Sequence, residues 1–308
     1  MDIMNNLIFV ISINLIKEET MQFKKEELIK SPLNYVGGKY KLLPQILPLF
    51  PDNIDTFYDL FCGGCNVGIN IKANKIICND VESAVIDLFN NWKELGTSKS
   101  LHKLKETINK YKLSKTNEEG FKSIREDYNN GNKSWDMFYS MLVHSFNNQI
   151  RFNKSGDYNM PFGKNRSSFN PNLEKNFIKF IDKLSELNIY FLNNNFNELI
   201  IDTNKLEVND FIYCDPPYLI TCASYNESNK WNKIKEKELL NLLDSLNKNN
   251  IKFAMSNVLE NKGKANNILK EWSKKYNVHH LNNTYGNCNY HAKDKSRTST
   301  DEVLITNY

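Results

Sequence analysis

The sequence predicts an α/β protein with an open, mainly parallel sheet and helices on both of its faces. Phe211–Cys214 is short and wholly apolar, which is typical of a central strand in a parallel sheet. Two prolines follow within three residues, and they end the strand because neither can donate to the ladder. Other short apolar runs, at 56–60, 76–79 and Ile189–Leu192, are separated by stretches of helical periodicity.

The stretch before residue 31 is assigned as an N-terminal extension. Its longest apolar run, 7–16, is too short to span a bilayer and lacks the basic region and cleavage site of a signal peptide. Met21 offers a second start, and we hypothesise that residues 1–20 are dispensable. Loss of folding on their deletion would refute that hypothesis.

The first motif is Ser-Pro-Leu-Asn-Tyr-Val-Gly-Gly-Lys at 31–39, which opens a helix expected over 42–47. Gly37 and Gly38 followed by Lys39 suit close approach of the backbone to a ligand. The spacing is not that of a Walker A loop. The alternative interpretation is a tight turn that caps the helix.

Residues 56–68 predict a strand, a glycine turn and a helix, with Gly63 and Gly64 in the turn. Glycines after a strand let the backbone approach a small ligand. The next strand, 76–79, leads to Asp80, and an acid at this place commonly binds ribose hydroxyls. The unit indicates a nucleoside-containing cofactor. Alternatively, Asp80 caps a helix over 82–92.

The amino-acid composition changes over 93–172, which is polar and rich in Lys and Asn. This region is mostly helical in pattern, with one short strand expected at 157–161. Within it, 145–166 alternates aromatic residues with Asn, Gln, Arg and Lys, the side chains that bond base edges and phosphates. A net charge of +4 and a pI near 8.5 permit a polyanionic partner without requiring one. The alternative is a polar hairpin with ordinary turn residues.

The rest of the chain completes the sheet. We expect helices over 173–187, 236–246 and 265–276, strands over 251–257, 278–281 and 303–306, and a mobile loop without periodicity over 219–231. Between 262 and 297, eight Lys or Arg residues stand against two acids. This excess of cations suits phosphate contacts, or alternatively a solvated basic surface.

The apolar strand delivers Asp215, the carbonyl of Pro216 and the ring of Tyr218 to the carboxyl edge of the sheet, where open α/β sheets bind ligands. Two acceptors beside a flat ring suit a planar amine, such as the exocyclic amine of adenine or cytosine, or a side-chain amide. The alternative is that Asp-Pro-Pro-Tyr merely ends the strand.

The six cysteines lack the paired spacing of a disulfide framework, and the CxxC at Cys62 and Cys65 has no second pair or nearby histidine. We therefore expect reduced thiols and no metal site. A chain with 40% hydrophobic and 25% charged residues has the composition of a soluble protein.

In this order, six motifs resemble those of the Dam-type DNA adenine-N6 methyltransferases, of class alpha: PLNYVGGK, DLFCGG, the acid at Asp80, FNNQIRFN with GDYNMPFGK, DPPY, and the terminal DEVLITNY. The resemblance covers 31–308. It implies a Rossmann-like S-adenosylmethionine-dependent methyltransferase sheet, formed by a catalytic domain over 31–92 and 173–308. The insertion, 93–172, is then a mainly helical target-recognition domain.

The resemblance implies S-adenosylmethionine as cofactor, double-stranded DNA as substrate and a base-flipping mechanism. It also implies a cytoplasmic protein of bacterial or phage origin, a monomer, and a cognate restriction endonuclease as partner. The implied catalytic residues are Asp215, Pro216, Pro217 and Tyr218. The implied cofactor-binding residues are Tyr35, which packs on the adenine, Gly37, Gly38, Lys39, Asp59, Phe61, Gly63, Asp80, which holds the ribose, and Asp215. The implied DNA-binding residues are Asn147, Gln149, Arg151, at the guanine-reading position, Asn153, Lys164, Asn165 and Arg297.

Several residues depart from the family's pattern. Cys65 stands where a glycine or another small residue is usual, and Asn195 stands where many relatives carry Asp before Phe. Gln149, Asn165 and Asn34 differ from residues that help to read GATC, so GATC is one candidate among short adenine-containing sites. Two alternatives stay open: a methyltransferase for RNA or a protein glutamine, and a DNA-binding relative without catalysis.

Overall fold

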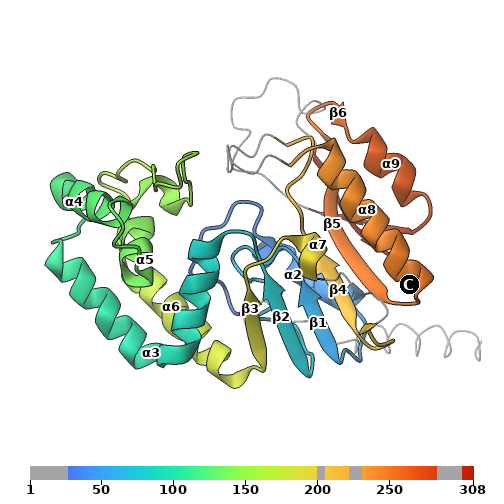
Figure 1. The fold of residues 1–308 in the computed structure, drawn as a ribbon, viewed down its shortest axis with the longest axis horizontal. Coiled ribbons are helices and arrows are strands. Elements are labelled where there is room, and N and C mark those ends of the chain that lie inside the picture. Colours follow the sequence, from blue (N-terminus) through green and yellow to red (C-terminus); the bar gives the residue numbers. More distant parts are fainter. Residues whose placement is uncertain (1–26, 200–204, 222–230, 283–299) are drawn as a thin grey trace, which may run out of the picture.

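The computed structural model describes residues 27–199, 205–221, 231–282 and 300–308, and Figure 1 shows their fold. The centre is one eight-stranded sheet in the order β3-β2-β1-β4-β5-β8-β7, with β6 paired to β5. The strands are β1 (Thr56–Asp59), β2 (Lys75–Asn79), β3 (Ile189–Leu192), β4 (Phe211–Cys214), β5 (Lys252–Asn261), β6 (Lys264–Ala265), β7 (Asn277–Leu281) and β8 (Thr300–Thr306).

The chain reverses its path across the sheet between β1 and β4. From β1 it moves outward to β2 and β3, then returns to place β4 on the other side of β1 and continues to β5. These four pairings are all parallel, whereas β8 runs antiparallel between β5 and β7. The carboxyl ends of β1 and β4 therefore flank a topological switch point, where open α/β sheets bind their ligands.

Helices cover both faces of this sheet, as the sequence predicts. They are α2 (Leu43–Ile46), α3 (Ser83–Lys110), α4 (Glu118–Asn129), α5 (Trp135–His144), α6 (Pro171–Glu186), α7 (Phe196–Leu199), α8 (Lys233–Lys248) and α9 (Asn267–Ser273). Because successive strand residues face opposite sides, Phe211 and Tyr213 of β4 enter the core shared with α2 and α3. Ile212 and Cys214 enter the core beneath α8 and α9. The predicted α/β fold class is confirmed.

Residues 93–172, the predicted insertion, share a core with the sheet layer. Helix α3 runs past residue 92, the end that periodicity predicts, and continues after a kink at Gly96, where φ is 70° and ψ is 177°. Just before the kink, the buried ring of Trp92 lies 5.0 Å from the rings of both Tyr139 in α5 and Phe177 in α6. In Figure 1, α3, α4 and α5 accordingly lie beyond the edge strand β3.

Three predicted elements take a different form. The helix expected over 42–47 is divided into η1 (Lys39–Lys41), α2 and η2 (Leu47–Leu49), because Pro44 and Pro48 cannot donate backbone hydrogen bonds. The helix expected after the glycine turn is a series of turns over 63–70, and within it Cys65 has a left-handed φ of 56°. The strand expected at 157–161 is reduced to an isolated bridge between Tyr158 and Phe152.

The boundaries near the end of the chain also shift. Strand β5 extends four residues beyond its predicted end, 257, because Lys262 and Gly263, with φ of 52° and 77°, turn the chain back into β6. Helix α9 begins only at Asn267, where the Asn266 side chain accepts a hydrogen bond from the Leu269 N–H at 3.2 Å. The hypotheses on residues 1–20 and Met21, and the mobility expected of most of 219–231, lie outside the described residues. None of the described helices is both long enough and apolar enough to span a membrane.

Candidate active site

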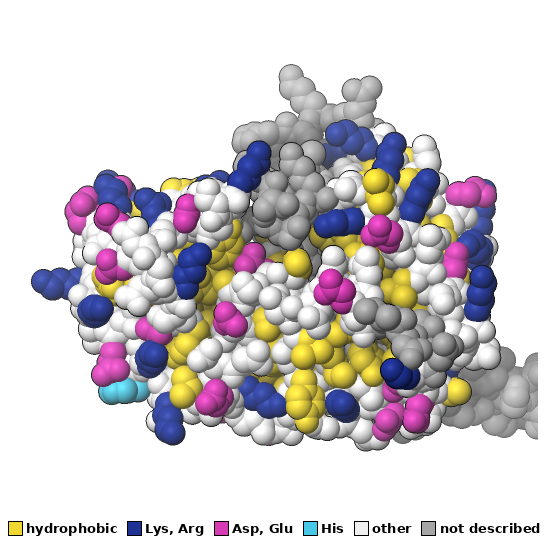
Figure 2. Space-filling model, in the orientation of Figure 1, with side chains coloured by type: hydrophobic (Ala, Val, Ile, Leu, Met, Phe, Trp, Pro, Cys, Tyr) yellow, Lys and Arg dark blue, Asp and Glu magenta, His cyan; other side chains and the backbone are white. Residues whose placement is uncertain are grey.

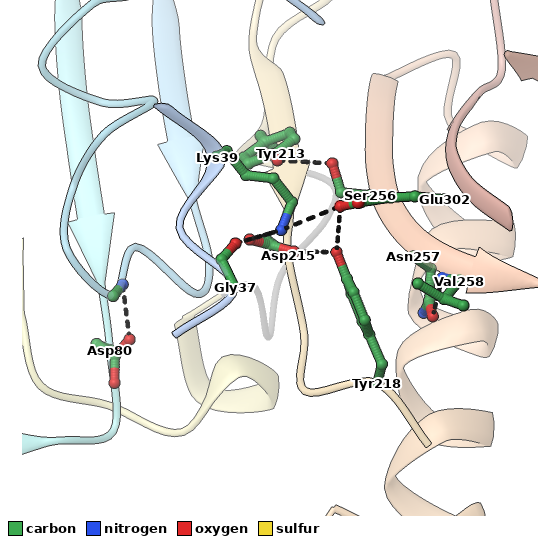
Figure 3. A network of polar contacts seen from close by, with 11 residues as sticks. Gly37, Lys39, Asp80, Tyr213, Asp215, Tyr218, Ser256, Asn257, Val258 and Glu302 are labelled. Carbon is green, nitrogen blue, oxygen red and sulfur yellow. Dashed lines mark hydrogen bonds and ion pairs between the residues drawn. The ribbon is translucent and has the colours of Figure 1, made fainter. Parts of the chain in front are cut away.

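Lys39 joins two carboxylates at the carboxyl end of β4 (Figure 3). Its Nζ lies 2.7 Å from Asp215 Oδ2 and 3.7 Å from Glu302 Oε1, and it donates to the Gly37 carbonyl oxygen at 2.6 Å. The Tyr218 hydroxyl lies 3.0 Å from Asp215 Oδ1 and 3.3 Å from Glu302 Oε1. Side chains from three distant parts of the sequence thus form one group, the Lys39 cluster (Lys39, Asp215, Tyr218 and Glu302).

This cluster carries an excess of negative charge in a buried place. The side chains of Lys39 and Glu302 are 3% and 2% exposed, and that of Asp215 is 18% exposed. Burial raises the pKa of Asp215, the Lys39 ammonium acts against that rise, and Glu302 adds to it. Asp59, at the end of β1, lies close enough for Asp215 to raise its pKa further, after burial as the main cause. Three carboxylates around one ammonium favour a bound cation or N–H donors.

The chain turns away from the sheet directly after Asp215. Pro216 is buried, Pro217 is exposed and the Tyr218 ring lies 5.1 Å from Lys39 Nζ, in cation–π contact. The structure therefore brings together Lys39 and Asp215, which the sequence singled out separately. Glu302 is a further member that the sequence analysis missed, although it stands within the terminal DEVLITNY motif.

The glycine turn after β1 lies against the ring of Tyr35. A Cβ atom on Gly63, whose φ is 46°, would meet Tyr35 Cδ1 at 3.0 Å, and one on Gly64 would meet Tyr35 Cβ at 3.2 Å. The backbone of the glycine turn, which was predicted to approach a ligand closely, therefore lies close to the ring of Tyr35 in the first motif. Phe61, at the start of the turn, packs against Phe196 with ring centroids 5.3 Å apart.

Asp80 fixes the conformation of this turn. Its Oδ2 accepts a hydrogen bond from the Gly63 N–H at 2.9 Å, and its Oδ1 accepts one from the Glu82 N–H at 3.0 Å. Asp80 is not the N-cap residue of the following helix, as the alternative interpretation had it, because α3 begins at Ser83 and its N-cap is Glu82. Asn79 adds a second tie that the sequence analysis missed, since its Nδ2 donates to Leu60 O at 3.1 Å and to Asn194 O at 3.0 Å.

A hydrogen bond from a side chain to a backbone carbonyl connects the first motif to the predicted insertion. Asn34 Nδ2 donates to Asn147 O at 2.7 Å. A cavity of about 30 Å³ lies at this junction, and Tyr35, Glu82 and Arg151 are among the residues that line it. The residues predicted to bind the cofactor and those predicted to bind DNA therefore meet here. Gly37 and Gly38 are exposed beside this junction.

The predicted DNA-binding residues have mixed environments. Arg151 donates through Nε to Asn159 Oδ1 at 2.7 Å and through Nη2 to Asn159 O at 2.6 Å, so one asparagine orients its guanidinium. Asn153 Oδ1 accepts from the backbone of Ser155 and Asp157, as the turn-forming alternative predicts. Asn147 and Asn165 have left-handed φ angles of 57° and 61°. Gln149 is partly buried, Lys164 is exposed, and Arg297 lies outside the described residues.

Charges of both signs are mixed on one face of the molecule. On the face drawn in Figure 2, Lys and Arg side chains alternate with Asp and Glu, so the net charge of +4 does not gather there as one basic patch. A large open cavity of about 950 Å³ lies at the opposite, amino edge of the sheet, with Asp55, Asn70 and Asn74 in its wall. It contains none of the predicted site residues.

Glu82 makes the stability of the site depend on pH. Burial raises the pKa of Glu82 from its ordinary 4.5 to about 7, a neighbouring backbone N–H opposes the rise, and the Asp80 charge adds to it. The pKa of Glu82 is higher in the folded protein, about 7, than in the unfolded chain, 4.5. The protonated side chain therefore contributes to the free energy of unfolding below pH 4.5, and this contribution is lost as the pH rises through about 7. Relative to wild type, Glu82→Gln should gain on the order of 2 kcal/mol at pH 8, allowing for partial exposure, and little at pH 4. Urea unfolding at both pH values tests this, and an equal difference at both would contradict it.

Comparison of the sequence with known proteins relates this chain to a family of DNA methyltransferases. The family model described as "D12 class N6 adenine-specific DNA methyltransferase" matches residues 35–287. The chain is 48% identical over 296 residues to the type II methyltransferase M.FokI of Planomicrobium okeanokoites, covering 95% of this chain and 45% of that protein. It is 47% identical over 289 residues to the modification methylase StsI of Streptococcus sanguinis, covering 92% and 43%. To the DNA adenine methylase of Escherichia coli it is 25% identical over 258 residues, covering 80% and 85%. The chain thus spans less than half the length of the first two relatives.

Proposed function

The chain belongs to the D12 class N6 adenine-specific DNA methyltransferase family, and from this premise we propose that it methylates the exocyclic N6 of adenine in a short duplex DNA site. The observation that carries the proposal is the position of Asp215. Its carboxylate lies at the switch point of the sheet, held by Lys39 at 2.7 Å and by the Tyr218 hydroxyl at 3.0 Å. That is an acceptor for an amine beside an aromatic ring.

The residues present fit S-adenosylmethionine as cofactor. Asp59 Oδ1 is buried and has no hydrogen-bond partner among the described residues, so a cationic or N–H group from a ligand would satisfy it. Tyr35, Lys39 and Asp80 would hold the nucleoside side, and Asp59 with the turn that contains Gly63 would face the methionine side. When bound, S-adenosylmethionine supplies an electrophilic methyl group on a positively charged sulfur.

The protein's part in the reaction is to orient the amine. The adenine N6 lone pair is delocalised into the ring, so the nitrogen is a weak nucleophile. Hydrogen bonds from its two N–H groups to Asp215 and to the Pro216 carbonyl would favour a tetrahedral nitrogen whose lone pair is free to attack. Alignment of the amine supplies much of the remaining rate enhancement. No enzyme-bound covalent intermediate is needed.

The target base has to leave the duplex to reach Asp215. Flipping costs a few kcal/mol, and stacking on Tyr218 would offset part of that cost. We propose residues 93–172 as the target-recognition domain and 31–92 with 173–308 as the catalytic domain. Arg151 is the residue proposed to read guanine, because an Arg fork bonds guanine O6 and N7. Asn159 already holds its guanidinium in one orientation.

The biological setting is proposed from the relatives. M.FokI and StsI are named as a type II methyltransferase and a modification methylase. A restriction endonuclease that cuts the same site is therefore the partner we propose. GATC stays one candidate recognition site, because Asn34 and Asn165 depart from the residues that help to read GATC. Asn34 donates to the backbone of Asn147, and Asn165 has a left-handed φ.

Expression in a host without adenine methylation, followed by single-molecule sequencing of its DNA, tests this function. We expect N6-methyladenine confined to one short motif, which also identifies the recognition site. A folded protein that binds S-adenosylmethionine but leaves no modified adenine would contradict the proposal. The substrate would then be sought among RNA and protein glutamine.

A further inference from the structure

Glu302 lies inside the proposed catalytic centre although it comes from the last strand of the chain. It pairs with Val258 across the β5–β8 ladder and is 2% exposed. This register places its carboxylate beside Lys39 Nζ, at 3.7 Å, and the Tyr218 hydroxyl, at 3.3 Å (Figure 3). Both of these groups also contact Asp215.

The two carboxylates compete for the same donors. A tyrosine hydroxyl has one proton, so Tyr218 can donate to Asp215 or to Glu302 but not to both at once. The Lys39 ammonium has three N–H groups, and its partners are the Gly37 carbonyl and these two carboxylates. Every donor that Asp215 releases therefore has a second acceptor within reach.

We propose that Glu302 is a positioning residue for methyl transfer, which accepts the hydrogen bond of the Tyr218 hydroxyl and shares the charge of Lys39 when Asp215 turns to the target amine. The inference rests on the proposed function and adds a residue to it. Lys39 holds Asp215 Oδ2, so in this proposal the amine N–H is accepted by Oδ1, the oxygen that now accepts from Tyr218. With Glu302 present, Tyr218 keeps a buried partner during that exchange, so its ring stays in place.

The same arrangement keeps Asp215 a strong acceptor. A lysine paired with Asp215 alone would neutralise the carboxylate that has to attract the amine. Shared with Glu302, the Lys39 ammonium leaves net negative charge at Asp215. Hydrogen bonds to such charged acceptors are stronger than those to neutral ones.

The test compares Glu302→Gln, which keeps the shape and removes the charge, with Asp301→Asn as control. Asp301 is the adjacent residue of β8, is 38% exposed and pairs with His280 away from the cluster. Single-turnover methylation is measured from pH 5 to pH 9, together with the dissociation constant of S-adenosylmethionine. Glu302→Gln keeps an oxygen that can accept from Tyr218 but loses the charge that draws on Lys39. Because misplacement of a reacting group costs up to about a hundredfold in rate, we expect a loss of about tenfold to a hundredfold in Glu302→Gln and none in Asp301→Asn.

The pH profile separates positioning from a merely structural role. Because the Glu302 charge raises the pKa of Asp215, its removal should move the acidic limb of the rate profile to lower pH. Cofactor affinity at pH 8 should stay within about threefold, since Glu302 is not itself among the residues proposed to contact the cofactor. An unmoved limb with a rate within twofold of wild type would overturn the inference, as would loss of cofactor binding in step with the rate.

Two further readouts keep the result decisive. In a Tyr218→Phe background the effect of Glu302→Gln should shrink, because the shared proton is gone; full additivity would count against the proposal. A wild-type protein that methylates no DNA would refute the proposed function alone. The pH dependence of cofactor binding, which needs no turnover, would then decide on Glu302, with coincident curves for wild type and Glu302→Gln overturning its role.

Discussion

Asp215→Ala is expected to lower the rate of adenine methylation by about 10²- to 10³-fold, the loss typical when a preorganised electrostatic partner of the reacting group is removed. Asp215 lies at the switch point of the sheet and is the acceptor that both Lys39 and Tyr218 surround. Without this acceptor the N6 nitrogen of adenine would stay planar, and its lone pair would not point at the methyl group. DNA binding should be largely retained, because the residues proposed to bind DNA, in 93–172, make no contact with this carboxylate in the described structure.

The measurement is single-turnover methylation of a duplex that contains the recognition motif, with DNA affinity measured on the same preparation. Asp215→Asn is the informative companion, since it keeps one acceptor oxygen but places an amide beside Lys39 Nζ, now 2.7 Å from the carboxylate. An intermediate rate is expected for it. Near-normal turnover of Asp215→Ala would remove Asp215 from the mechanism, and loss of DNA binding in parallel would show a structural role.

The sequence predicts the centre of this fold well because local signals and tertiary context agree there. Phe211–Cys214 has no residue that a half-exposed strand would need, and all four positions are buried. The prolines after Asp215 mark the end of the strand without any knowledge of its neighbours. Lys39 and Asp80 could be predicted from the sequence for the same reason, since each follows a recognisable local motif.

Other features depend on strand pairing, which one sequence does not reveal. Periodicity predicts a strand at 303–306, but nothing local says that Glu302 would face Lys39 from β8, 263 residues further along the chain. The register of β8 against β5 decides this, and a slip of one residue would point Glu302 to the other face. The turns after Cys65 escaped prediction because a left-handed φ at a non-glycine residue follows from surrounding contacts.

Lys39→Met is expected to destabilise the fold by about 3 kcal/mol at pH 8, because it leaves buried carboxylates without their cation. Asp215 and Glu302 would then face each other, with Asp59 nearby, and a methionine would replace the stem of Lys39 but not its charge. The loss should depend strongly on pH. Without Lys39 the pKa of Asp215 rises further above its unfolded value, since the ammonium now lowers it.

A carboxylate whose folded pKa is raised destabilises the fold when it ionises, so the penalty appears as the pH rises through that pKa and fades as the pH falls. The free energy of unfolding in urea, measured at pH 5 and pH 8, should therefore differ from wild type much more at pH 8. Lys41→Met is the matched control, because Lys41 lies in the same short helix but is exposed. An equal loss at both pH values would show that Lys39 contributes packing and not charge, which would also remove the electrostatic basis for its role beside Asp215.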